Sequence, residues 1–183
     1  MSTDNSAGSA SGDSATAIEL LYSDFAAEHA ATRKLLARVP DGKGDWKPHE
    51  RSAPLYKLAT HVADIPNRGV SILTTEELDA TTRVPAAPLT TVAELLASHD
   101  KNVAALNAAL AQTSLAELEK EWQIRRGEQI MIRGKRRALL RTVMMSHLVH
   151  HRAQLGVYLR LLDIEIPGMY SPSADDLAGH AKL

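Results

Sequence analysis

The sequence contains no cysteine, and this absence excludes several kinds of protein chemistry. Disulfide frameworks, thiolate metal sites and cysteine nucleophiles all need a side chain that this chain does not have. Imidazole and carboxylate groups are therefore the strong metal ligands that the chain can offer.

Aromatic residues are also scarce, at 4% of the sequence, whereas hydrophobic residues make up 44%. Leu, Ala, Val and Ile must fill the core, and this composition favours helices over sheets. At 183 residues the chain is short enough to fold around a single core, because cores stop growing at roughly 250 residues.

Long apolar runs and a strong excess of charge are missing as well. No segment approaches the roughly 20 consecutive apolar residues that cross a bilayer, and the first residues lack the basic and apolar regions of an export signal. A net charge of -1 gives no overall attraction to nucleic acid or to anionic membranes. We therefore expect a cytoplasmic protein that binds neither a membrane nor nucleic acid.

Four segments carry the apolar periodicity of amphipathic helices. They span residues 16–39, 55–65, 92–110 and 136–162. Pro66 is expected to bend or end the second helix, because proline lacks the backbone N–H of a helical hydrogen bond. Helices of this length and number predict an all-α fold, a four-helix bundle, whose core commonly holds metal sites on facing helices.

The remaining segments carry weaker patterns. Residues 113–135 alternate loosely between apolar and polar side chains, which favours extended or irregular structure. Residues 1–15 are small and polar, so they are expected to form a flexible tail. The bundle domain is therefore predicted to span residues 16–183.

Two histidines lie four residues apart in the last predicted helix. On a helical wheel His147 and His151 fall in its apolar stripe, so they are expected to face the core, whereas His150 points to the edge of the stripe. Side chains at this spacing can bind one metal ion. His61, at the rim of the apolar face of the second helix, is expected to join them, which predicts a three-histidine metal centre.

The spacing alone leaves a structural alternative open, because a chain with eight histidines can place two on one helix face by chance. No glutamate stands between His147 and His151, so the general base of a zinc-protease motif is missing. A three-histidine centre with an open position can nevertheless lower the pKa of bound water. We assign no role to His29, His49, His99 and His180.

A basic run surrounds the start of the last predicted helix. Against the single acid Glu128 it contains Arg125, Arg126, Arg133, Lys135, Arg136, Arg137 and Arg141. Such a run can bind nucleic acid, but neither interleaved aromatics nor a helix-turn-helix pattern accompanies it. A solvated face, a dimer contact or a contact with the carboxylates of a thiol cofactor is the better interpretation.

Several stretches around the histidines form a recognisable pattern. They are His147-Leu-Val-His-His151-Arg152-Ala-Gln154-Leu, Tyr158-Leu-Arg160, Ile166-Pro-Gly-Met-Tyr170-Ser-Pro-Ser-Ala-Asp175-Asp, Lys47-Pro-His-Glu-Arg-Ser52 and Leu58-Ala-Thr-His61-Val-Ala-Asp64-Ile-Pro66. Together they resemble the DinB family of metal-dependent proteins. The chain departs from that pattern at Ser171, where relatives often carry glycine, and at Asp64, where a glutamate is frequent.

The resemblance implies a DinB/YfiT-like four-helix bundle, often a homodimer, with one divalent ion on His61, His147 and His151. Nickel or zinc is the implied metal, with iron as a further candidate. Relatives with known activities use the ion to activate a low-molecular-weight thiol, so a thiol transferase or a hydrolase is expected. Asp64 and Gln154 are candidate partners of the ligands. A non-catalytic, metal-binding stress-response bundle is the alternative.

Overall fold

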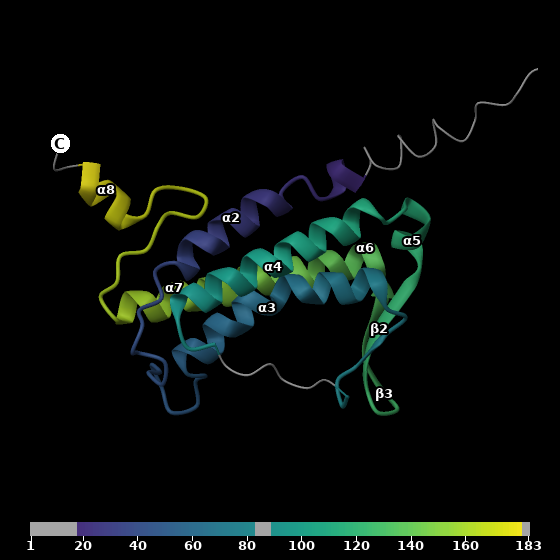
Figure 1. Ribbon diagram of the computed structural model, residues 1–183, viewed down its shortest axis with the longest axis horizontal. Coiled ribbons are helices and arrows are strands. Elements are labelled where there is room, and N and C mark those ends of the chain that lie inside the picture. The colour runs from purple at the N-terminus through teal and green to yellow at the C-terminus, as the bar shows by residue number, and fades with distance from the viewer. Residues whose placement is uncertain (1–17, 83–88, 181–183) are drawn as a thin grey trace, which may run out of the picture.

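The computed structural model describes residues 18–82 and 89–180, and the tail predicted at residues 1–15 lies outside them. Four long helices dominate the described residues (Figure 1). They are α2 (Phe25–Leu36), α3 (Leu55–Thr74), α4 (Val92–Ala111) and α7 (His147–Leu161). Helices α2 and α3 each pack against α4 and α7, and one hydrophobic core lies between them. The prediction of a mostly helical fold is therefore confirmed.

Two predicted helices have different limits in the structure. The segment predicted at residues 16–39 is divided by a turn at residues 22–24, which separates a short helix from α2. Helix α3 does not end at Pro66 but continues to Thr74. Pro66 is itself buried, and nearby Gly69 lets the Leu106 side chain approach closely, so packing outweighs the hydrogen bond that proline removes.

The last predicted helix is helical over almost its whole length, but not uniformly α-helical. It comprises α6 (Arg136–Leu139), a π-helical segment (Leu140–Ser146) and α7. A π-helical turn bonds each N–H to the carbonyl five residues back, so the side chains that follow are rotated relative to a continuous α-helix. The π-helical segment packs against α3 and ends directly before His147.

A small sheet lies at one end of the helices, where α3 ends and α6 begins (Figure 1). Its strands are β1 (Leu78–Asp79), β2 (Glu121–Arg126) and β3 (Gln129–Lys135), preceded by the short α5 (Leu115–Glu119). Strand β1 pairs parallel to β2, and β2 pairs antiparallel to β3. Gly127, between β2 and β3, adopts a positive φ of 58° that favours glycine.

The sheet corrects the prediction of an all-α fold, although extended structure was expected within residues 113–135. Strand β2 buries Trp122 and Ile124 against the helices, whereas the apolar side chains of β3 are exposed. Two inward residues are too few to give a clear alternating pattern in the sequence. After α7 the described residues end with a short helix, α8 (Ala174–His180).

Among residues 18–82 and 89–180, no helix is both long enough and apolar enough to cross a bilayer.

Candidate metal centre

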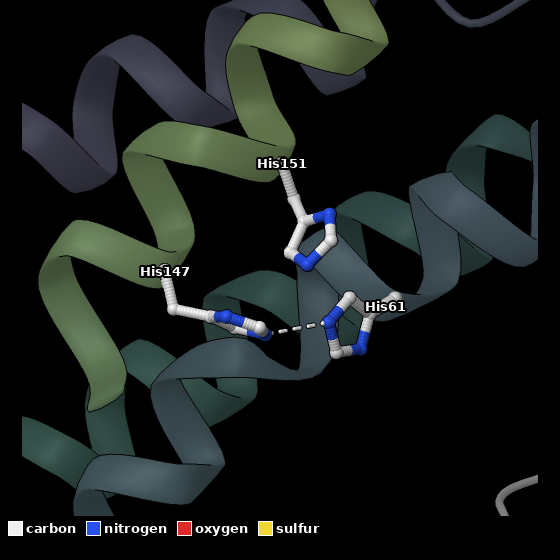
Figure 2. A group of neighbouring side chains, drawn as sticks. All are labelled: His61, His147 and His151. Carbon is white, nitrogen blue, oxygen red and sulfur yellow. Dashed lines mark hydrogen bonds between the residues drawn. The ribbon is translucent and has the colours of Figure 1, made fainter. Parts of the chain in front are cut away.

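The structure brings the three predicted ligands together, although His61 lies far from the other two in the sequence. Helix α3 carries His61, and α7 carries His147 and His151 (Figure 2). One ring nitrogen of each residue lies within 4.8 Å of the corresponding nitrogen of the other two. The Nε2 atoms of His61 and His147 are 2.9 Å apart. In the part of the chain that the structure describes, this is the group of side chains positioned to bind a metal ion.

Local helix geometry explains why these side chains converge. His147 and His151 are four residues apart, so they occupy adjacent positions on one face of α7, and their ring centroids are 4.4 Å apart. Packing of α3 against α7 brings the His61 ring to 4.6 Å from that of His151. The site therefore depends on the contact between two helices and not on a loop.

The prediction that both histidines of α7 face the core is only partly correct. His61, His147 and His151 are all half-buried and lie at the rim of the core. The buried positions of α7 are instead Leu148, Arg152, Leu155 and Leu159. A wheel drawn at one constant angle assumes an unbroken α-helix, and the π-helical segment before His147 breaks that assumption. Half-burial leaves the imidazoles accessible from solvent.

The electrostatics of the site favour neutral imidazoles. Burial, together with the nearby His151 and Arg68, lowers the pKa of His147 from its ordinary value near 6.5 to about 4. Burial also lowers the pKa of His151, while its hydrogen bond to Gln154 acts in the opposite direction. Neutral imidazoles carry the lone pairs that metal binding needs, so both ligands are available at neutral pH.

Two side chains of α7, Gln154 and His150, contact His151. The Nδ1 atom of His151 lies 2.7 Å from Oε1 of Gln154, one turn further along α7. His150 is exposed, and its ring centroid is 4.8 Å from that of His151. Asp64 is half-buried on α3 and does not belong to the group of converging ligand atoms. The structure therefore shows the expected contact between Gln154 and a ligand, His151.

The three imidazoles fit a tetrahedral metal ion. With metal–nitrogen distances of about 2.0–2.1 Å, tetrahedral coordination separates neighbouring ligand atoms by roughly 3.3 Å. The nitrogens here lie from 2.9 Å to at most 4.8 Å apart, a range that includes this separation. Three imidazoles fill three of four positions and leave one for water or a substrate, as in catalytic zinc sites.

The other histidines are not part of this centre. His29 and His99 are buried against each other between α2 and α4, with ring centroids 5.8 Å apart. His49 is exposed in a loop, where its Nδ1 accepts a hydrogen bond from the backbone N–H of Arg51. His180 is the last residue of α8.

Much of the basic run is paired with acidic side chains. Arg125 contacts Glu77 and Asp79, while Lys135 and Arg137 share Glu119. Two further members of the run are also engaged: Arg141 pairs with Asp24, and Arg136 donates a hydrogen bond to the Ile72 carbonyl. These contacts join the sheet and α6 to the rest of the fold.

A buried charge cluster on the other side of α7 was not predicted. Arg152 is 2% exposed and forms a 2.6 Å ion pair with Glu28 of α2. It also donates hydrogen bonds to the Tyr170 hydroxyl and to Oγ1 of Thr32. A wheel restarted at His147 places Arg152 beside Leu148 and Leu155 on the buried face, and that is the signal that would have found it.

Comparisons with known proteins agree with this architecture. A search of curated proteins finds no match. A crystal structure of a DinB-like protein from Bacillus subtilis has 20% sequence identity and a TM-score of 0.63, covering 82% of this chain and 97% of its own. A DinB-like protein from Bacillus cereus has 20% identity and a TM-score of 0.62, with 83% and 97% covered. The DinB family model matches residues 1–182, so this chain belongs to the DinB family.

Proposed function

We propose that this protein binds one divalent metal ion, nickel or zinc with iron as a further candidate, through His61, His147 and His151. The observation that carries the proposal is the convergence of three half-buried imidazoles from two helices within 4.8 Å. Leucine side chains would pack a contact between two helices better than three half-buried imidazoles do, so packing alone does not explain the cluster. Imidazole binds each of these metals well, so three histidine ligands are compatible with all of them and do not identify which one is bound.

We further propose that the bound ion activates a low-molecular-weight thiol or water for transfer or hydrolysis. Such an ion lowers the pKa of the group in its open position. No carboxylate joins the three histidines in the ligand group found within the described residues. A thiol has an ordinary pKa near 8.5 and loses its proton more readily than water, so its activation depends less on a protein base. The donor set therefore favours thiol transfer over hydrolysis.

The catalytic proposal is tested by turnover of thiol-conjugation and hydrolysis substrates by metal-loaded protein. The wild type is compared with His151→Ala, which removes a ligand, and with His49→Ala, which removes an exposed loop histidine. We expect turnover in the wild type and in His49→Ala and its loss in His151→Ala. Equal rates in all three proteins would overturn the catalytic proposal.

The alternative is a non-catalytic metal site within a four-helix bundle. It is favoured by one observation: the ligands connect α3 and α7, so an ion would cross-link helices that are distant in sequence. This alternative predicts a large fall in melting temperature on chelation and no turnover of any substrate class.

We also propose, from the resemblance to the DinB family, that the protein is a cytoplasmic homodimer. Sedimentation velocity would test the oligomeric state.

A further inference from the structure

The hydrogen bond between His151 and Gln154 determines more than the position of one ring. The Nδ1 atom of His151 is 2.7 Å from Oε1 of Gln154. A carbonyl oxygen can only accept a hydrogen bond, so Nδ1 must carry the hydrogen. In a neutral imidazole the other nitrogen, Nε2, then has a free lone pair. Figure 2 shows one nitrogen of His151 directed toward His147 and His61 and the other directed away.

The other two ligands are arranged differently. The Nε2 atoms of His61 and His147 lie 2.9 Å apart, a hydrogen-bonding distance. At this distance one Nε2 must donate to the other and therefore carries a hydrogen. That histidine has to move its hydrogen to Nδ1 before its Nε2 can bind a metal. His151 needs no such change.

We infer that Gln154 is a positioning residue of the metal centre, which holds His151 in the Nδ1–H tautomer and presents its Nε2 to the ion. His151 is then prepared for metal binding before the ion arrives, unlike the histidine that donates from Nε2 in the pair of His61 and His147. The inference rests on the proposed metal-binding function and adds to it the tautomer of His151 and the role of Gln154 in setting that tautomer. Partners behind a metal-ligating histidine act in this way, by fixing ring orientation and raising basicity.

Packing does not explain the position of Gln154. The residue is exposed on α7, where any good helix former would serve. Its contact with His151 joins side chains three residues apart, which alone stabilises a helix only slightly. Its amide oxygen nevertheless meets the one ring nitrogen of His151 that faces away from the centre.

Two variants separate positioning from structure. Gln154→Met keeps the length and helix propensity of the side chain but removes the acceptor, whereas Gln154→Glu keeps an acceptor at the same place. The first readout is long-range proton–nitrogen NMR of the metal-free protein, which reports the tautomer of His151. The second readout is zinc affinity, measured by competition with a chromogenic chelator.

We expect a protonated Nδ1 on His151 in the wild type and in Gln154→Glu, and a loss of that preference in Gln154→Met. Zinc affinity should fall by roughly 10- to 100-fold in Gln154→Met and stay within a few-fold of wild type in Gln154→Glu. An unchanged tautomer in Gln154→Met, or equal zinc affinity in all three proteins, would overturn the inference. A wild type that binds no zinc would instead overturn the proposed function, and NMR of the metal-free protein would still decide whether Gln154 sets the tautomer.

Discussion

Replacing the buried His29 with leucine should make the stability of this protein less sensitive to acid. His29 on α2 is 4% exposed, and its ring lies between those of Phe25 and His99. Neither of its ring nitrogens has a hydrogen-bond partner, and Nδ1 of His99 has none either. Burial, together with the nearby His99 and Arg152, lowers the pKa of His29 to about 4. Protonation of the ring would place an uncompensated charge in the core.

The size of the effect follows from this pKa. The unfolded chain binds a proton at His29 near pH 6.5, whereas the folded chain binds it only near pH 4. Between these values the unfolded state holds more protons, so the free energy of unfolding falls as the pH falls. The change is about 1.4 kcal/mol per pH unit and about 3 kcal/mol in total. The pKa of His99 is also lowered, mainly by burial, and acts in the same direction.

Urea unfolding of metal-free protein at several pH values from 7.5 to 4 would measure this difference. His29→Leu removes the titrating group and two unpaired nitrogens, so at pH 7.5 it should be as stable as wild type or more stable. Its advantage should then grow by about 3 kcal/mol toward pH 4. His49→Leu, at an exposed loop position, is the matched control and should follow the wild type. A difference between His29→Leu and wild type that stays constant with pH would refute the reasoning.

Three further predictions concern the C-terminal turn, the buried ion pair and the metal centre. Gly168→Ala should lower the melting temperature, because the Cβ of the new alanine would lie 2.1 Å from the Ser171 carbonyl oxygen and clash with it. An unchanged melting curve would contradict this. Arg152→Met should destabilise the fold by about 3 kcal/mol in urea unfolding, since it leaves the half-buried Glu28 carboxylate without its cation; a loss below about 1 kcal/mol would argue against it. Metal affinity, measured by chelator competition, should persist at pH 6 and fall toward pH 4, because His147 has a pKa of about 4; complete loss at pH 6 would be inconsistent with this.

The sequence predicts the convergence of the three histidines because its main signal is local. Two histidines at a spacing of four share a helix face whatever the rest of the fold does, and His61 lies at the edge of another apolar face. The structure brings these three together. Their exact burial was not predictable, because the π-helical segment at Leu140–Ser146 changes the phase of the helix without a sequence pattern to mark it.

The parts of the fold that were missed depend on contacts between distant segments. Strand β1 has only two residues, which is too short for a recognisable sequence pattern. Its pairing with β2 depends on the folded arrangement, which brings the chain after α3 to the sheet. Helix α3 continues through Pro66 because α4 and α7 cover it, which a local rule for proline cannot include. The burial of Arg152 depends on Glu28 and Tyr170, which lie in other parts of the chain.

The most direct test of the central claim is elemental analysis of tag-free protein. The wild type is compared with His147→Ala and His151→Ala, and with His49→Ala as a control that removes a histidine outside the centre. We predict about one metal ion per chain in the wild type and in His49→Ala, and its loss in both ligand variants. A wild type without metal after supplementation with nickel, zinc or iron, or ligand variants that retain a full equivalent, would contradict the account.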